Sequence, residues 1–212
     1  MKNTPASWDE RARTEPSSWQ AASWSQAGQV RRFDAVYTQL LSRFRDDDTI
    51  LDYGCGTGAF ARFCGHAEYV GYDWSREMRE RARREHPRAT IVDELDEFVF
   101  DHVVCIGPFN LADNWSKEET WKTLEELWTK HTGRSLVVSL FRERGQTPSS
   151  MLAYSPIETV AFAQSIGCTA FRLVTDHLPN DLILAAFREP RRYSAPAELP
   201  ARDVGDHQGQ GV

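Results

Sequence analysis

From residue 26 to residue 167 the chain alternates between short apolar runs and longer amphipathic stretches, and this alternation constrains its fold more than any other feature. Apolar runs of roughly four to eight residues are typical of buried strands, and apolar residues three or four positions apart are typical of helices. Strands that alternate with helices predict a parallel sheet with helices on both faces. The expected strands are 49–54, 68–73, 89–93, 100–107 and 135–141, and the expected helices are 26–45, 58–64, 75–85, 116–133 and 155–167.

The pattern changes near the end of the chain. The apolar runs 171–178 and 181–187 are separated only by Pro179 and Asn180, so no helix fits between them and they are expected to pair antiparallel. The expected fold is therefore α/β: a Rossmann-like, mostly parallel sheet of seven strands with a terminal antiparallel hairpin and helices on both faces. Ligands bind such sheets beyond the carboxyl ends of the strands, and the ends of the first six strands are expected to form that edge.

A glycine-rich loop, Gly54-Cys55-Gly56-Thr57-Gly58, joins the first of these strands to the next helix. Glycine lets the backbone turn sharply and lets a ligand approach closely, and the helix that follows offers its free amides. The spacing differs from the dinucleotide pattern G-x-G-x-x-G, and no Gly-Lys-Ser/Thr of a phosphate loop is present. The loop therefore favours a smaller adenosine ligand that has no pyrophosphate.

Acidic residues end the next two strands. Asp73 follows the second strand, where a carboxylate can accept two hydrogen bonds from ribose hydroxyls. Asp93 ends the third strand, where an acid can accept the amino hydrogens of adenine, and Glu94 and Leu95 follow it. The fourth strand ends in "CIGPFN", which places four residues where a reacting group would lie: Ile106, Pro108, Phe109 and Asn110.

The stretches "ILDYGCGTG" and "YVGYDWS" resemble motifs one and two of the class I S-adenosylmethionine-dependent methyltransferases. The resemblance covers roughly residues 28–188 and implies S-adenosyl-L-methionine as methyl donor and S-adenosyl-L-homocysteine as product. It implies that the loop glycines lie near the methionine part, that Asp73 holds the ribose and that Asp93 meets the adenine amino group. Asp52 would order the loop. The cofactor contacts expected on this basis and from the strand ends are Asp52, Gly54, Cys55, Gly56, Gly58, Asp73, Trp74, Met78, Asp93, Glu94, Leu95 and Ile106.

The stretch after the fourth strand also bears on the acceptor. "GPFNL" resembles a branch of small methyltransferases with G-x-F-N at this position. Methyltransferases that act on amino groups of nucleic acids often carry Asn/Asp-Pro-Pro-Tyr/Phe there instead, so that chemistry is not supported. No acidic metal-binding pair stands out, and no metal is expected.

Four polar residues are candidates for chemistry at the same edge, each with a purely structural alternative. His177 is the candidate general base, because imidazole titrates near neutral pH; the alternative is a hairpin turn. Asn110 would orient a polar substrate group or else cap a strand end. Arg142 would bind a substrate carboxylate, and Arg32 or its neighbour Arg31 would bind the cofactor carboxylate.

The two ends of the chain differ in composition from the middle. Residues 1–27 are polar but carry Trp8, Trp19 and Trp24, which either dock this segment on the domain or close it over a ligand as a lid. As a lid it would bring Trp19 and Trp24 to the substrate, together with Phe109, in an aromatic pocket. Residues 28–188 form the expected domain, and residues 189–212 are expected to be a disordered tail.

Composition bears on partners and location. The net charge of −6 disfavours a protein that mainly grips phosphate backbones, although five arginines in the helix 75–85 form either a solvated face or a docking face. No apolar run is long enough to span a bilayer, no signal peptide is recognisable, and four cysteines without metal spacing indicate a cytoplasmic protein. A small-molecule substrate, methylated on oxygen or nitrogen, is favoured. The alternatives are a nucleic-acid or protein methyltransferase and a non-catalytic S-adenosylmethionine-binding module.

Overall fold

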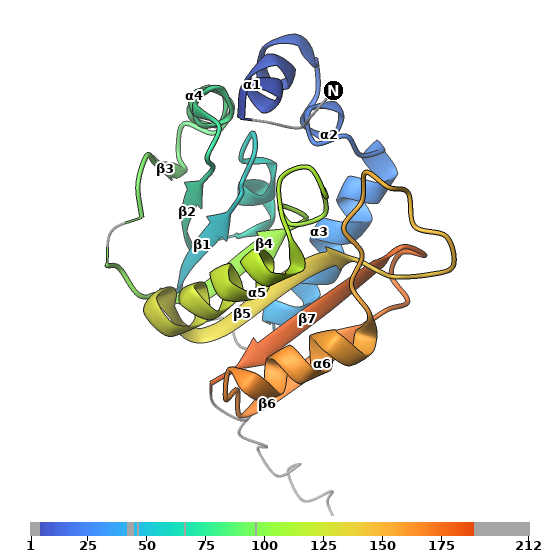
Figure 1. The fold of residues 1–212 in the computed structure, drawn as a ribbon. Coiled ribbons are helices and arrows are strands. Elements are labelled where there is room, and N and C mark those ends of the chain that lie inside the picture. Colours follow the sequence, from blue (N-terminus) through green and yellow to red (C-terminus); the bar gives the residue numbers. More distant parts are fainter. Residues whose placement is uncertain (1–4, 42–44, 46, 66, 96, 189–212) are drawn as a thin grey trace, which may run out of the picture.

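A computed structural model describes residues 5–188 except 42–44, 46, 66 and 96, and the tail predicted at 189–212 lies outside the described residues. Seven strands form one sheet in the order β3-β2-β1-β4-β5-β7-β6 (Figure 1). The strands are β1 Thr49–Tyr53, β2 Glu68–Tyr72, β3 Thr90–Val92, β4 Phe100–Ile106, β5 Thr132–Phe141, β6 Ala170–Val174 and β7 Asp181–Phe187. Neighbouring strands are parallel except β7, which is antiparallel to both β5 and β6. The predicted fold class is confirmed, including the terminal hairpin.

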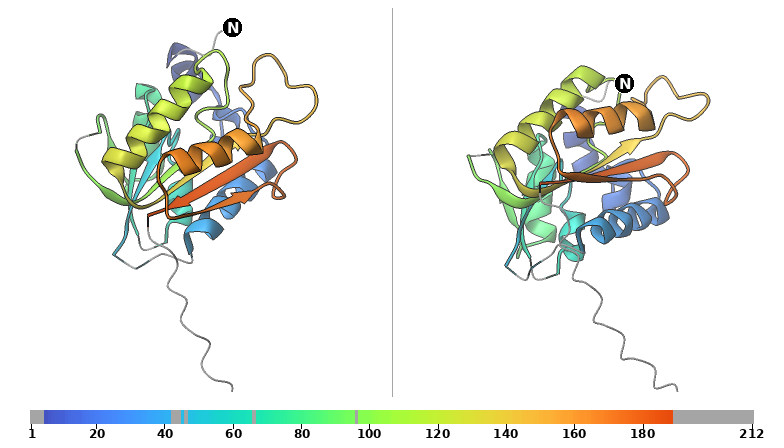
Figure 2. Two further views of the ribbon diagram at one scale, coloured as in Figure 1. Left: turned by 60° about the horizontal axis from the view of Figure 1, so that its bottom comes forward. Right: turned by 90° about the horizontal axis from the view of Figure 1, so that it is seen from below.

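Helices cover both faces of the sheet. Figure 2 shows α5 and α6 on one face, with α3 and α4 on the other. The helices are α1 Pro5–Thr14, α2 Ser18–Ala21, α3 Gln26–Leu41, α4 Arg76–Glu85, α5 Lys117–Glu126 and α6 Pro156–Ser165, with a 3-10 turn η1 at Ala59–Phe63 and a π turn η2 at Leu127–His131. None of the described helices is long and apolar enough to cross a membrane.

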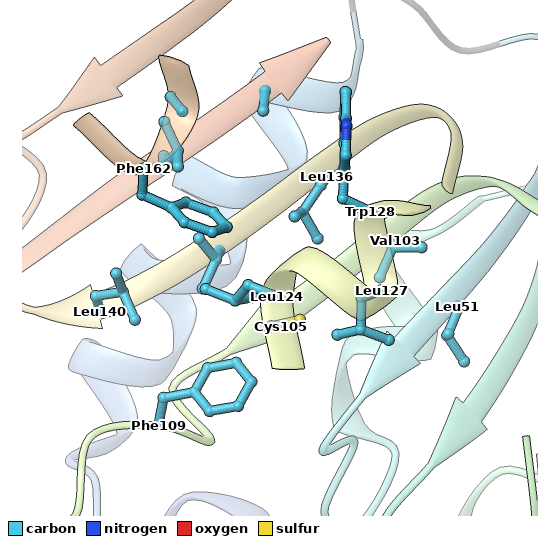
Figure 3. Close-up of a cluster of buried hydrophobic side chains, with 14 of the residues drawn as sticks. Leu51, Val103, Cys105, Phe109, Leu124, Leu127, Trp128, Leu136, Leu140 and Phe162 are labelled. Carbon is cyan, nitrogen blue, oxygen red and sulfur yellow. The ribbon is translucent and has the colours of Figure 1, made fainter. Parts of the chain in front are cut away.

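Each face of the sheet has its own buried core. The α5–α6 face packs side chains such as Leu124 and Phe162 onto Val103 and Leu136 of the central strands (Figure 3). The opposite face packs α3 and η1 onto the same strands through residues that include Phe33, Val36 and Phe60. Because both faces are covered, the central strands read as nearly continuous apolar runs.

Local sequence explains where most helices begin. Ser75 caps α4, and Ser116 and Ser155 form capping boxes at α5 and α6 with Glu119 and Glu158, as their spacing predicts. Gly133 was expected to end the helix 116–133. It lies inside β5 instead, because η2 leads directly into a strand that begins at Thr132.

Two further boundaries differ from the sequence pattern. The helix expected at 58–64 is the short 3-10 turn η1, preceded by Gly58 in a left-handed conformation. Strand β6 ends at Val174, so His177 lies in the turn that leads to β7 rather than on a strand. The edge formed by the carboxyl ends of the parallel strands is nevertheless where the sequence placed it.

Candidate active site

A cavity lies at the carboxyl ends of β1, β2 and β4. Most of its lining comes from the glycine loop, the ends of β2 and β4, and the segment that precedes β1. The lining residues are Trp8, Ser18, Ala21, Ala22, Trp24, Gln29, Phe33, Asp52, Gly54, Cys55, Gly56, Thr57, Ala59, Asp73, Trp74, Met78, Ile106, Gly107 and Pro108.

The glycine loop adopts a conformation that side chains disfavour. Gly54, Gly56 and Gly58 have φ angles of 79°, 54° and 75°, in the left-handed region that glycine enters without strain. A Cβ atom on Gly54 would lie 2.7 Å from Pro108, whereas one on Gly56 would meet nothing within 4 Å. Since Gly56 lines the cavity, its backbone is open to a ligand.

Asp73 fastens this loop to the start of α4. Its Oδ2 atom accepts the Gly56 N–H at 2.9 Å, and its Oδ1 atom accepts the Ser75 N–H at 2.8 Å. Burial raises the pKa of Asp73 to about 6, although these two amide hydrogen bonds oppose the shift. A carboxylate has about four acceptor sites, so capacity remains for two ribose hydroxyls.

Asp52 is the second buried acid of the cavity. It accepts a hydrogen bond from the Tyr69 hydroxyl at 2.7 Å. Burial raises the pKa of Asp52 to about 7, the Tyr69 hydrogen bond opposes this, and the nearby charge of Asp73 adds to it. Two buried carboxyl groups that share a cavity favour a ligand that brings positive charge.

The N-terminal segment forms one wall of the cavity. Trp8 comes from α1, and Trp24 lies between α2 and α3. Trp24 packs against Gly107, where a Cβ atom would lie 2.7 Å from its ring. Ser18 donates a hydrogen bond to Gln29 at 3.0 Å, and both line the cavity. Residue 107 therefore has to be glycine for this wall to close.

The structure brings many of the predicted residues together and leaves others apart. Nine predicted cofactor or substrate contacts line the cavity: Trp24, Asp52, Gly54, Cys55, Gly56, Asp73, Trp74, Met78 and Ile106. Gly58 lies behind the loop, where a Cβ atom would be 3.2 Å from Ala82 and His86. Its role is to let the loop pack on α4.

The end of β3 does not reach the cavity. Asp93 is 64% exposed and pairs with Arg79 at 2.8 Å and Arg83 at 3.0 Å. Glu94 and Leu95 are absent from the described lining as well, and Leu95 packs against the core on the α5–α6 face. The structure thus assigns these three residues no direct contact with the cavity, because β3 is short and its end turns toward the arginines of α4.

Arg32 and His177 share one partner, Asp181. Arg32 Nε donates to Asp181 Oδ2 at 2.6 Å, and His177 Nε2 lies 3.1 Å from the same oxygen. Asp181 is 1% exposed and also accepts a hydrogen bond from Ser139 at 3.0 Å. The Arg32 guanidinium lies 4.5 Å from the ring centre of Trp24. This cluster therefore adjoins the cavity on the far side of Trp24, while Arg31 is exposed.

The other predicted substrate contacts have structural partners. Phe109 is fully buried and packs on Tyr53 and Trp115. Asn110 accepts the Phe141 N–H at 2.7 Å, which ties the ends of β4 and β5 together. Arg142 donates to the Thr175 carbonyl at 3.0 Å. Trp19 lies outside the described lining, and its carbonyl accepts the Trp24 N–H.

Sequence reasoning missed three residues that matter here. Asp181 was missed because it lies beyond the gap at Pro179 and Asn180, at the start of the next strand. The signal for Asp181 was its place at the start of β7, which the antiparallel register pairs with Phe141 at the end of β5. Gln29 and Thr57 also line the cavity, and no pattern in the sequence marks them.

The fold, the glycine loop and the paired acids together define a methyltransferase of the Rossmann-like class. A family model described as a methyltransferase domain matches residues 24–196, and the chain belongs to that family. Together with the two motifs of the glycine loop and β2, this makes the chain an S-adenosylmethionine-dependent methyltransferase. No curated protein matches the sequence.

Solved structures share the architecture. Magnesium protoporphyrin IX methyltransferase (ChlM) from Synechocystis PCC 6803 with bound SAH has a TM-score of 0.66 and 16% identity over 89% of this chain and 95% of that one. DhpI in a SAM–HEP complex has a TM-score of 0.64 and 13% identity over 87% and 95%. The Haloferax volcanii complex of the Trm112 methyltransferase activator with a methyltransferase has a TM-score of 0.61. Its identity is 16% over 86% of this chain and 98% of that one. At these identities the likeness shows the fold.

The residues of the cavity fit S-adenosylmethionine. Gly56 leaves open space beside the loop, Asp73 keeps acceptor capacity, and Asp52 provides negative charge for an ammonium group. Trp74 and Met78 offer an apolar wall for the adenine. Among the described residues, no group of three or more His, Cys, Asp or Glu side chains is arranged to hold a metal ion.

Proposed function

We propose that this enzyme transfers the methyl group of S-adenosylmethionine to an oxygen or nitrogen atom of a small molecule, such as an intermediate of natural-product synthesis. One observation carries the proposal: the chain's own N-terminal segment lines one side of the cavity with Trp8, Ala21, Ala22 and Trp24. A wall that the chain itself supplies, with two tryptophans among its residues, suits a small acceptor. In this view residues 1–27 act as a lid on the domain formed by residues 28–188.

The cofactor supplies a methyl group already activated by its positive sulfur, so the chain has to orient the acceptor and exclude water. Orientation of this kind contributes roughly 7–11 kcal/mol at best. Trp24 is placed for both tasks, because it lines the cavity and is held between Gly107 and the Arg32 guanidinium. Its ring would cover the reacting end of the site.

His177 remains the proposed general base, with Asp181 as its positioning residue. The Asp181 carboxylate only accepts hydrogen bonds, so the hydrogen between them belongs to His177 Nε2. The lone pair of His177 is then on Nδ1, which is buried and has no partner among the described residues. That atom would take the proton of a hydroxyl or amino acceptor once the turn that carries His177 opens toward the cavity, whose described lining does not include it. Asn110 and Arg142 are engaged in structural contacts and are weaker candidates for contact with the acceptor.

The arginines of α4 do not support a nucleic-acid docking face. Arg79 and Arg83 pair with Asp93, and Arg81 is buried against carbonyls of α1 and the residue after it. Three of the five arginines therefore serve internal contacts. The four cysteines are free, which supports the further proposal that the protein works in the cytoplasm.

An acceptor screen tests the proposal. The full-length protein would be supplied with S-adenosylmethionine and small phenols, carboxylic acids and amines, beside RNA, DNA and protein, at low and high salt. We expect formation of S-adenosylhomocysteine with a small molecule, at a rate that salt changes little. Methyl transfer to a nucleic acid or protein that falls steeply with salt would contradict the proposal.

The same screen tests the base. His177→Gln should lower turnover by roughly a hundredfold or more without changing the affinity for S-adenosylhomocysteine. Turnover in this variant equal to that of the wild type would remove His177 from the mechanism. Asp176→Asn is the matched control, because Asp176 lies beside His177 in sequence and has no part in the proposed chemistry.

A further inference from the structure

Three buried side-chain nitrogens have no hydrogen-bond partner among the described residues: Trp8 Nε1, Trp115 Nε1 and His177 Nδ1. Native proteins leave few buried polar atoms unpaired, and each of them calls for an explanation. Trp8 is the one of the three that lines the cofactor cavity. We propose that the Trp8 indole N–H donates a hydrogen bond to a ring nitrogen of the adenine, so that α1 recognises the base.

The polarity of the indole selects the ligand atom. Tryptophan Nε1 is a donor only, so it cannot pair with the amino group of adenine. The ring nitrogens of adenine that bear no hydrogen are acceptors. Because Trp8 lines the cavity and its buried donor has no partner among the described residues, this donor complements the ring edge of the base.

The surroundings of Trp8 identify the end of the cavity that receives the base. Trp8 packs with Met78, Ala12 and Ala21 in an apolar cluster. The neutral, aromatic adenine suits such a surface, whereas the charged ammonium and carboxylate of the methionine part do not. Asp73, the proposed ribose partner, precedes the helix that carries Met78, so base and ribose would lie side by side.

Specific contacts hold α1 in this position. Asp9, the next residue after Trp8, accepts the Ser75 hydroxyl at 2.5 Å and the Glu77 N–H at 3.3 Å, at the first turn of α4. Arg81, which is 7% exposed, donates to the carbonyls of Ala12 and Glu15 at 3.1 and 2.6 Å. Helix α1, which carries Trp8, is therefore fixed to α4, whose first turn Asp73 contacts through Ser75.

The residues at the end of β3 do not line the cavity, so the structure shows no contact from them to the adenine. Asp93, which was expected to accept the adenine amino hydrogens, is engaged by Arg79 and Arg83 instead. Trp8 offers a polar contact to the base from another part of the cavity wall, because its Nε1 has no partner among the described residues. The N-terminal segment would thus be part of the cofactor site as well as a cover for the acceptor.

The test is a calorimetric titration of the full-length protein with S-adenosylhomocysteine and with analogues in which one adenine ring nitrogen is replaced by carbon. The wild type should bind one analogue about tenfold more weakly than the parent compound. Trp8→Phe keeps a ring but loses the donor, so it should bind the parent about tenfold more weakly and no longer distinguish that analogue. Trp19→Phe, outside the lining, should behave as the wild type.

Two results would overturn the inference. The first is a wild type that binds every analogue as tightly as the parent, and this result does not depend on the folding of any variant. The second is a Trp8→Phe protein that binds and discriminates as the wild type does. Because only cofactor binding is measured, the outcome is independent of the acceptor and of the role proposed for His177.

Discussion

Both ends of the parallel strands carry buried acids, and the acids at the two ends have different partners. At the amino ends, Asp48 accepts hydrogen bonds from His102 at 3.0 Å and Arg134 at 2.6 Å, and His102 also contacts Ser135 at 2.7 Å. At the carboxyl ends, Asp52 and Asp73 have raised pKa values, and Trp8 Nε1 and His177 Nδ1 have no hydrogen-bond partner among the described residues. One end satisfies its polar groups internally, while the other leaves capacity for a ligand.

The cluster at the amino ends resembles a catalytic site but is not accessible to a substrate. Ser135, His102 and Asp48 follow one another in the order of a catalytic triad. Ser135 and His102 are both completely buried, however, so no substrate can reach the hydroxyl. The difference between the two ends teaches that partners and exposure, rather than the types of residues, distinguish a structural cluster from a functional one.

The largest expected effect is a loss of stability when the cluster at the amino ends of the strands is changed. His102→Leu removes the hydrogen bonds that His102 makes with the buried Asp48 and Ser135 and should lower the free energy of unfolding by about 3 kcal/mol. Ser135→Ala should cost about 1 kcal/mol. Neither change should alter the affinity for S-adenosylhomocysteine. Urea denaturation and calorimetric titration of both variants check this, and a parallel loss of affinity would break the comparison.

The next effect is the pH dependence of cofactor binding. Burial raises the pKa of Asp52 to about 7 and that of Asp73 to about 6, so both carboxyls take up protons as pH falls through this window. The cofactor brings an ammonium group that favours the ionised forms. Its affinity should therefore rise from pH 5 to 7, by up to about tenfold per pH unit for each group that must ionise, and level off above.

The same shifts have a consequence for the protein without cofactor. An acid whose folded-state pKa is raised binds more protons in the folded state, so its contribution to stability is present at low pH and is lost as pH rises through about 7.

The variant Asp52→Asn tests the pH dependence of cofactor binding, because it should remove the part of the profile near pH 7. A profile that is unchanged in this variant would exclude Asp52 as the source.

The smallest expected effects separate two glycines of the loop. Gly58→Ala places a Cβ atom 3.2 Å from Ala82 and His86, and Gly56→Ala places one in open space at the cavity. Both adopt a left-handed conformation, which costs an alanine about 1–2 kcal/mol. We expect Gly58→Ala to lower mainly the melting temperature. Gly56→Ala should lower the affinity for the cofactor more than Gly58→Ala does. Equal effects of the two on affinity would contradict this division.

The sequence predicted the fold closely because the signals were local. Apolar runs, capping residues such as Ser75, and the two-residue gap at Pro179 and Asn180 specify elements that contact their neighbours in the chain. The glycine loop and Asp73 were found for the same reason, since the end of one strand and the next turn define them.

The rest of the site depends on contacts between distant segments. Asp181 contacts His177 within the terminal hairpin. It also contacts Arg32 of α3, which is 149 residues away in the sequence. Asp93 was expected at the cavity from its strand end, whereas in the structure it lies outside the described lining and pairs with two arginines of α4. Trp8 reaches the cavity because Asp9 and Arg81 hold α1 on α4, and spacing along the chain does not reveal such contacts.

The most direct test of the central claim is calorimetric titration of the full-length protein with S-adenosylmethionine and S-adenosylhomocysteine, beside Asp73→Ala and the milder Asp73→Asn. The account predicts micromolar binding by the wild type, weaker binding by Asp73→Asn and none by Asp73→Ala, with circular dichroism showing an intact fold in all three. A wild type that binds neither compound, or a folded Asp73→Ala that binds as well as the wild type, would contradict it.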